Sequence, residues 1–181
     1  MTLHAVGKVK LYFGTSSALY DLTQHMEDGW QLVGNVNVAR RRRVTGSGSL
    51  GLSAYGVQQG LSVVGTIRLH ADTKALLTGG GDGFAWVEDG NSSPGRVVCF
   101  PAQVKARPVT TPSADVATFA LALVMSAAGA VEDALKTSGS QNPSGKIGYQ
   151  RQSNKIVQIT SAATASSSQP IVVGTPWTTE G

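Results

Sequence analysis

The stretch DVATFALALVMSAAGAV, residues 115–131, decides the fold class because it fits two incompatible structures. As a strand, it places its large apolar residues on one face, namely Phe119, Leu121, Leu123 and Met125. The alternate residues are mostly small and apolar, which is typical of a strand buried on both faces. As a helix, it would begin near Pro112-Ser113 and continue through an Ala-rich run, which helix propensity favours. Periodicity does not separate the two alternatives. We predict a strand, because the segments around it read as strands.

Alternation of apolar and polar residues predicts further strands on both sides of this stretch. The clearest lies within residues 61–69, and others are expected in residues 8–13, 31–40, 96–107, 155–160 and 171–173. Pro101 interrupts one of them, so we expect that strand to lie at a sheet edge or to be bulged. One short helix is expected near residues 71–77, capped by Asp72 and ended by the glycines of residues 79–83. The predicted fold class is therefore mainly β.

Neither the N-terminus nor the apolar stretch is expected to enter a membrane. Residues 1–14 lack a long apolar run and a small-residue cleavage site, so we expect no signal peptide. The apolar stretch of residues 116–131 is shorter than the roughly 20 residues that a spanning helix needs. The single cysteine, Cys99, excludes a disulfide within the chain.

The composition indicates a protein that associates with copies of itself. Charged residues make up 14% of the chain, below the roughly 25% that is usual, and it contains 22 glycines. Few charges and many small residues suit a surface that is hidden in an assembly. The net charge of +4 is local, because Arg40 to Arg43 form one run. A nucleic-acid binder would spread its basic residues along a face and interleave aromatic residues.

Searching the sequence for chemistry gives no site that we expect to be catalytic or to bind a metal or cofactor. His4, His25 and His70 do not have the spacing of zinc ligands, and Cys99 has no CxxC partner. Residues 21–28 gather acids and one imidazole, for which an acid–base or metal role is conceivable, but a solvated loop is the favoured interpretation. Residues 79–83 lack the Lys-Ser/Thr of a phosphate-binding loop. We therefore expect no enzyme and no small-molecule substrate.

The run Arg40, Arg41, Arg42 and Arg43 has three interpretations. It could hold nucleic-acid phosphates, protect a sheet edge against unwanted pairing, or bind acidic loops of a neighbouring subunit. Alternation in a strand would send two arginines to each face, so no single patch of four charges forms. We favour the subunit contact over the phosphate contact. The candidate acidic partners are Glu27, Asp28, Glu88 and Asp89.

The order of these segments resembles that of the tail tube (major tail) proteins of siphophages, over about residues 6–136. The matching pieces are Val9-Lys-Leu-Tyr-Phe-Gly14, Asp21-Leu-Thr23, Gly34-Asn-Val-Asn-Val-Ala-Arg40, Leu61-Ser-Val-Val-Gly65 with the helix after it, and Asp115-Val-Ala-Thr-Phe119 through Val131. Their order carries the resemblance more than any one motif does. The run of four arginines departs from the family pattern, and residues 138–181 have no counterpart.

The resemblance implies a β-sandwich with one short flanking helix, whose inner sheet closes into an oligomeric β-barrel. It also implies hexameric rings that stack into the tube through which phage DNA is ejected, with DNA passing without tight binding. The loop after the arginines, residues 45–51, would then reach the next ring. The implied partners are further copies of the chain, a tape-measure protein and other tail proteins. The implied location is the virion tail, after assembly in the host cytoplasm.

Two other functions remain as alternatives: a capsid decoration or head–tail completion protein, and a cytosolic nucleic-acid-binding β protein. For domain organisation, we expect a tail-tube-like sandwich in residues 1–137 and a Ser/Thr-rich arm or small β appendage in residues 138–181. Residues 138–145, SGSQNPSG, have the composition of a linker. On this division, truncation after Thr137 should leave the sandwich folded.

Overall fold

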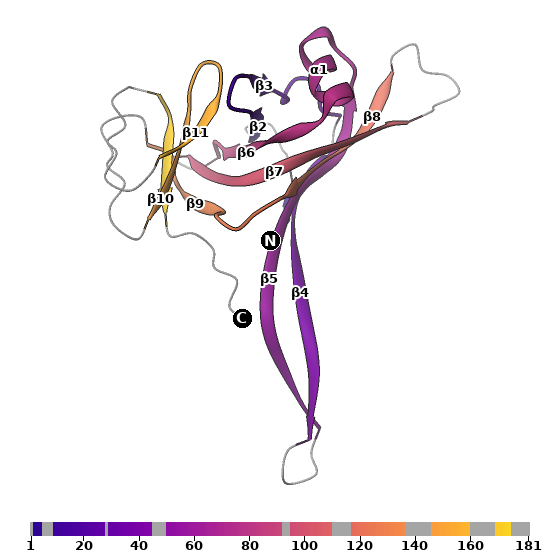
Figure 1. The fold of residues 1–181 in the computed structure, drawn as a ribbon, viewed down its shortest axis with the longest axis vertical. Coiled ribbons are helices and arrows are strands. Elements are labelled where there is room, and N and C mark those ends of the chain that lie inside the picture. The colour runs from indigo at the N-terminus through magenta and orange to yellow at the C-terminus, as the bar shows by residue number, and fades with distance from the viewer. Residues whose placement is uncertain are drawn as a thin grey trace.

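The computed structural model describes residues 2–4, 9–27, 29–44, 50–91, 95–109, 117–136, 146–159 and 169–174. Figure 1 shows a rounded body from which two long neighbouring strands project. In chain order, the strands are β1 (Thr2–His4), β2 (Val9–Gly14), β3 (Leu19–Asp21), β4 (Gln31–Val44), β5 (Leu50–Arg68), β6 (Gly81–Asp89), β7 (Arg96–Val109), β8 (Thr118–Met125), β9 (Val131–Ala134), β10 (Ile147–Arg151), β11 (Ile156–Ile159) and β12 (Ile171–Gly174). The helix α1 (Ala71–Gly79) lies between β5 and β6. The prediction of a mainly β chain with one short helix is confirmed within these ranges.

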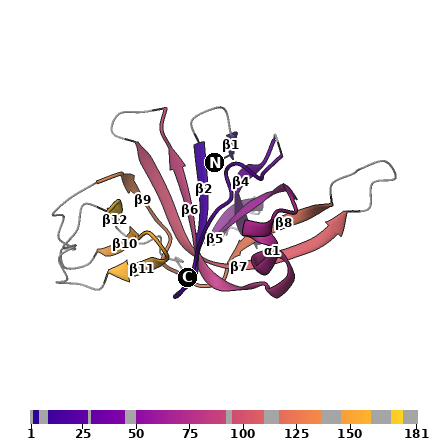
Figure 2. The same cartoon turned by 90° about the horizontal axis from the view of Figure 1, so that it is seen from above.

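Two antiparallel sheets make up the described part of the chain. The larger has the order β1-β4-β5-β8-β7-β6-β2-β3, and β9 pairs with β7 beside β8. The smaller has the order β11-β10-β12. Figure 2 shows the smaller sheet and α1 on opposite sides of the larger one.

One face of the larger sheet packs into the main apolar cluster. Strand alternation directs every second residue of β2, β5, β7 and β8 to this face. The fully buried side chains of the cluster include Leu11, Phe13, Val63, Ile67, Phe100 and Leu123. The helix adds Leu76 and Leu77 to it, and the segments before β4 add Leu22 and Trp30. Burying each large apolar side chain contributes about 1.5–3 kcal/mol, so this cluster dominates the stability of the body.

The other face of the larger sheet is covered at one end by the smaller sheet. Trp86 of β6 and Cys99 of β7 point to this face and share a second apolar cluster with Tyr149, Ile156 and Val172. The Tyr149 hydroxyl donates a buried hydrogen bond to the Gly129 carbonyl at 2.6 Å, which joins the two sheets. Strands β10, β11 and β12 thus form a second layer on this face of the larger sheet. Whether residues 1–137 fold alone stays a prediction.

Strand β8 confirms the strand interpretation of the stretch that decides the fold. Leu121 and Leu123 are buried in the main cluster, and Phe119 and Met125 pack against it half-buried. The opposite face differs from the expectation, because Ala120, Ala122 and Val124 are only half-buried. No described element covers them, so this face of β8 is partly open to solvent. Residues 110–116, with which the alternative helix would begin, lie outside the described residues.

Strand β7 corrects the prediction that Pro101 marks an edge strand. β7 is central: β6 pairs with Arg96–Val104 on one side, while β9 and β8 share the other. β8 ends opposite Ala102 and β9 begins opposite Cys99, so Pro101 lies at the junction between them. The Pro101 carbonyl accepts from Ser126 N at this junction. Proline lacks an N–H and is tolerated here because neither neighbour requires a donor at this point.

Helix α1 is capped by His70 rather than by Asp72. Nδ1 of His70 accepts from Asp72 N at 3.2 Å, and Thr73 Oγ1 accepts from His70 N at 3.2 Å. These bonds satisfy backbone donors that the first turn leaves unpaired. The helix ends at Gly79, and Gly80 and Gly81 both have positive φ, which favours glycine. Among the described residues, no helix is long and apolar enough to cross a membrane.

Candidate assembly surface

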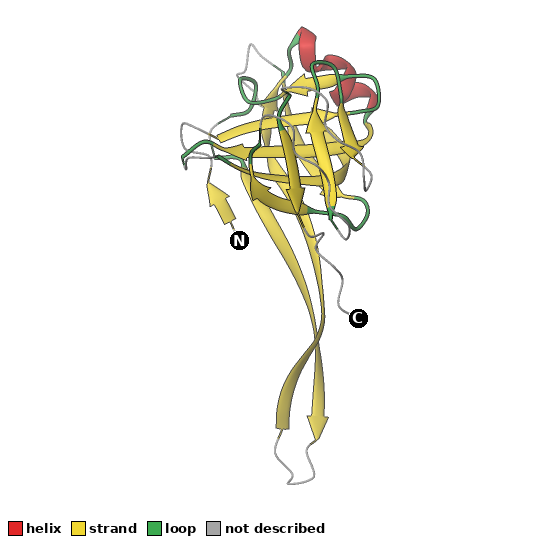
Figure 3. Ribbon diagram, turned by 90° about the vertical axis from the view of Figure 1, so that its left-hand side faces the viewer, coloured by secondary structure: helices red, strands yellow, loops and turns green. Residues whose placement is uncertain are grey.

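The projecting part of β4 and β5, residues 34–44 and 50–61, is called the ribbon here. Its strands pair with each other from Gly34↔Leu61 to Val44↔Leu50, with one register shift between Asn37 and Ala39. On the other edge of β4, pairing with β1 reaches no further than Val33. On the other edge of β5, pairing with β8 starts at Ser62. Among the described residues, the ribbon therefore has an open hydrogen-bonding edge on each side. Figure 3 shows it twisting away from the body.

A two-stranded ribbon with open edges is expected to be stabilised by pairing with another strand. Isolated hairpins are at best marginally stable in water, because two strands do not bury an apolar face. Their unpaired N–H and C=O groups are also a template for pairing with another chain. The ribbon is longer than the strands with which most sheets are built. Its length is consistent with a segment whose conformation is completed by contact with a neighbour.

The arginine run lies in the outer part of the ribbon. Arg40, Arg41, Arg42 and Arg43 of β4 are opposite Ala54, Ser53, Leu52 and Gly51 of β5. The structure thus places the run in a strand, as the alternation argument requires. Of the loop that follows, residues 45–49 lie outside the described residues. The ribbon carries the run away from the body, where the candidate acidic residues lie.

Glu27 is engaged within its own chain. Its carboxylate accepts from Arg68 through two hydrogen bonds, one of them from Nη2 at 3.2 Å. These hydrogen bonds lower the pKa of Glu27 below its ordinary value, and the positive charge of Arg68 adds to the effect. The pair is partly exposed, so it remains within reach of another chain. Asp28, the residue after it, lies outside the described residues.

Glu88 holds the two sheets of the body together. Its Oε2 accepts from Trp86 Nε1 at 3.1 Å and from Arg151 Nη2 at 3.3 Å. The Arg151 guanidinium also lies over the ring of Tyr12, 4.2 Å from its centroid. Burial raises the pKa of Tyr12, and the charge of Arg151 opposes this. Because both members of the Glu88–Arg151 pair are mostly buried, Glu88 is the least accessible of the described candidate acids.

Asp89 ends β6 and shapes the turn that follows. Its Oδ1 accepts from Asn91 N at 2.9 Å and from Asn91 Nδ2 at 2.8 Å. Asp89 thus has a structural role within the chain, yet it remains half-exposed at a loop. Of the candidate acids, the described Glu27, Glu88 and Asp89 lie on the body, whereas the arginine run lies in the ribbon.

The uncovered face of β5, β8 and β7 is a second surface of interest. Val64, Ala120 and Ala122 lie side by side on it, and Lys105 and Arg107 stand beside them on β7. With neighbouring residues, they line an open hollow of about 390 Å³. The small alternate residues of the stretch 115–131 mark this face in the sequence. Whether the face is covered or open depends on which strands become its neighbours.

The comparisons with known proteins give one structural likeness. No family matches the sequence, and no curated protein matches it. The fold is similar to a chain of the solved structure "Tail of empty GTA particle computed with helical refinement, C6 symmetry". The TM-score is 0.50 with 11% sequence identity, and the match covers 73% of this chain and 98% of that chain. At this identity, the likeness establishes a shared fold.

Proposed function

We propose that this chain is a structural subunit of a phage-like tail, that it forms hexameric rings, and that these rings stack into a tube through which DNA is ejected. The observation that carries the proposal is the ribbon, which extends the larger sheet past all of the partner strands that the structure describes. The shared fold with a chain from a C6-symmetric tail supports it. A ring of copies supplies the neighbours that a single chain lacks.

In the proposed ring, the larger sheets of adjacent copies join into one continuous barrel. The short strands β1 and β3 are the edges of this sheet, and the ribbon adds longer open edges. Closing a sheet on itself removes such edges and with them the risk of uncontrolled aggregation. The uncovered face of β5, β8 and β7 would then be hidden or would line the tube.

In the proposed stack, the arginine run contacts acidic residues of a copy in the next ring. Arginine suits such contacts because its planar fork binds a carboxylate in two places. Glu27 with Asp28, and Asp89, are the favoured partners, because Glu88 is tied to Arg151. Other tail proteins, including a tape-measure protein, would meet the tube at its ends. The chain would act in the virion tail after assembly in the host cytoplasm.

Electron microscopy of a ribbon-shortened variant tests the proposal. Replacing residues 37–58 by Asn-Gly would join Val36 to Gln59, which already face each other, through a two-residue hairpin turn. We expect the native chain to form rings and tubes in negative stain, while the variant keeps a folded body and forms no tubes. Tubes from the shortened variant would contradict the role of the ribbon. A native chain that stays monomeric, even under crowding, and binds only assembled capsids would instead identify a decoration protein.

A further inference from the structure

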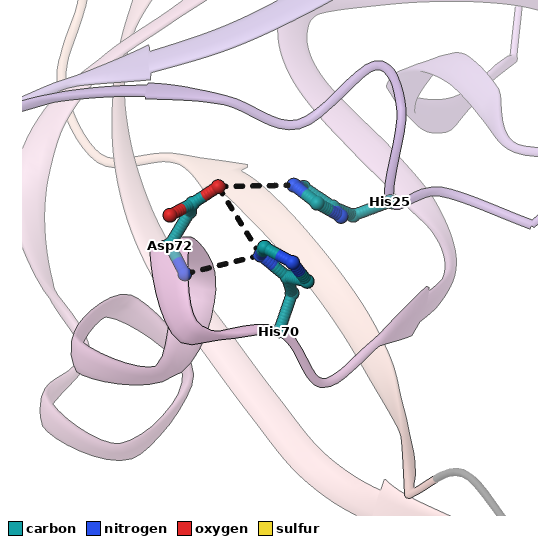
Figure 4. Close-up of side chains that lie close together, drawn as sticks. All are labelled: His25, His70 and Asp72. Carbon is teal, nitrogen blue, oxygen red and sulfur yellow. Dashed lines mark hydrogen bonds and ion pairs between the residues drawn. The ribbon is translucent and has the colours of Figure 1, made fainter.

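We propose that His25, His70 and Asp72 form a binding site for a divalent transition-metal ion of the zinc class. This inference does not depend on the proposed tail function. Figure 4 shows the two imidazoles lying one above the other, each with a nitrogen directed toward the Asp72 carboxylate. In the sequence, His25 groups with the acids of its own loop, and its spacing from His70 is not that of zinc ligands. The fold brings it to two residues at the start of α1.

The backbone of each of these residues is held in place. The His25 carbonyl accepts from Arg68 N at 2.9 Å, and the next residue, Met26, forms a bridge with Ile67 of β5. His70 is fixed by its bonds with the buried Thr73, and Asp72 lies in the first turn of the helix. The three side chains thus come from a loop, a helix cap and a helix, all anchored to the same end of β5. Ligands held by anchored backbone require little ordering when an ion binds.

The distances between the ligand atoms are close to those that a shared ion would set. Asp72 Oδ2 lies 3.1 Å from His70 Nδ1 and 3.9 Å from His25 Nε2. The longer separation is beyond a hydrogen bond. An ion bound at about 2.0–2.2 Å to each of two ligands holds them about 3.3–3.6 Å apart in tetrahedral geometry, which lies between the two observed distances. Nitrogen and oxygen atoms of all three residues lie within 4.8 Å of one another.

Binding requires one imidazole to turn. The rings are stacked with centroids 4.5 Å apart and planes at 21°, so a single ion cannot lie in both ring planes. His70 is the ring that can move, because its side chain is 52% exposed, whereas that of His25 is 17% exposed. Turning it withdraws Nδ1 from Asp72 N, where it caps the helix. Thr73 Oγ1 still accepts from His70 N, so half of the cap remains.

The ligand types select the kind of ion. Two imidazoles and one carboxylate suit Zn²⁺, Co²⁺ or Ni²⁺, while Mg²⁺ and Ca²⁺ prefer oxygen ligands alone. The exposure of Asp72 and His70 gives an ion access and leaves its remaining position to water. A bound ion would connect the loop before β4 to the start of α1.

Titration with Co²⁺, whose visible absorption reports its coordination, tests the site in the untagged chain. We expect the native protein to bind one Co²⁺ that Zn²⁺ displaces, and His25→Asn and His70→Asn to weaken binding at least tenfold. Asparagine at position 70 retains a side chain that can cap the helix, so loss of binding there is not loss of the cap. Asp72→Asn, which keeps the size of the side chain, should also weaken binding tenfold or more.

The third histidine of the chain provides the matched control. His4→Asn should leave Co²⁺ affinity unchanged, and the circular dichroism of all variants should match that of the native protein. The native protein alone should also show a higher unfolding temperature with Zn²⁺, because an ion that binds only the folded state stabilises it. The proposal is overturned if Co²⁺ binds no more tightly to the native chain than to the variant lacking both His25 and His70, or if His4→Asn abolishes binding.

Discussion

The body and the ribbon use the same two strands, β4 and β5, in different surroundings. Inside the body, these strands have partners on their outer edges and contribute Leu32, Val63 and Ile67 to the main cluster. In the ribbon, they have only each other among the described residues. Burial of apolar surface stabilises the first arrangement, while a two-stranded ribbon by itself is at best marginally stable in water. From this comparison we expect folding and the proposed assembly to depend on separable parts of the chain.

Truncation after Thr137 is expected to have the largest effect on the body. It removes β10, β11 and β12 and exposes the part of the second cluster that the larger sheet contributes, namely Trp86, Val97, Cys99 and Val131. Uncovering several large side chains costs about 1.5–3 kcal/mol each, which approaches the roughly 5–15 kcal/mol by which domains are stable. We expect the truncated chain to lose its cooperative thermal unfolding, as followed by circular dichroism. A cooperative transition in the truncated chain would support the two-domain division expected from the sequence.

Leu121→Ala tests the main cluster and should have the next largest effect. Leu121 is buried at the centre of β8, so the substitution should lower the free energy of unfolding by about 2–5 kcal/mol. Urea denaturation measures this change. Val64→Ala, on the uncovered face of the neighbouring strand, is the matched control and should cost clearly less. Equal losses for the two variants would mean that the faces of the sheet are assigned incorrectly.

Alkaline pH should weaken the second cluster by a smaller amount. Burial raises the pKa of the Cys99 thiol and of the Tyr149 hydroxyl, whose ordinary values are about 8.5 and 10. Because the folded-state values are higher, the stability that they contribute is complete below pH of about 8.5 and falls as pH rises. The loss is at most about 1.4 kcal/mol per pH unit for each group. Urea midpoints between pH 8 and 10.5 measure it.

Variants of these two residues separate their contributions to the pH dependence. Cys99→Ala should remove the loss of stability that begins near pH 8.5. Tyr149→Phe should remove the loss of stability that begins near pH 10. A native midpoint that stays constant over this range would contradict the burial of both groups.

Arg41→Glu combined with Arg43→Glu should have the smallest effect on stability and should abolish tube assembly. Substitutions away from a packed core usually change stability by no more than about 0.5 kcal/mol. We expect thermal unfolding to be unchanged while tubes no longer form in electron micrographs. Raised salt should weaken stacking of the native chain, because partly exposed ion pairs are screened.

The control for this variant is Lys74→Glu with Lys136→Glu, which makes the same change of charge at exposed positions on the body. It should assemble normally. If the arginine variant instead polymerises normally and loses affinity for DNA, the run is a nucleic-acid contact.

Local patterns in the sequence were sufficient for much of the fold. The alternation in residues 61–69 predicted a strand, and the segment after His70 predicted the helix, because periodicity and capping act over a few residues. For residues 119–125, periodicity fitted both a strand and a helix, and the strands expected around them decided the prediction. Strand β10 was missed because Gly148, Tyr149 and Gln150 show no alternation. Pro101 was misread because a single sequence does not reveal that β8 and β9 meet end to end beside β7.

The site residues were harder to predict, because their meaning comes from distant parts of the chain. The arginine run is visible in the sequence, but the pairing of Glu88 with Arg151 and of Glu27 with Arg68 follows only from the arrangement of the sheets. The meeting of His25 with His70 likewise depends on how the loop before β4 pairs with the end of β5. The residue types indicate which interactions these side chains can make, and the arrangement of the strands determines with which residue each one interacts.

The way in which β5 joins the body determines how a force along the ribbon would be transmitted. β5 continues from the ribbon into its ladder with β8, from Ser62↔Val124 to Arg68↔Thr118. Antiparallel hydrogen bonds lie perpendicular to the strands, so tension along the ribbon would load this whole ladder in shear instead of opening one bond at a time. Force on one copy would therefore pass through β8 to β7 and into both sheets. In a filament, such a strand would resist stretching along its own length.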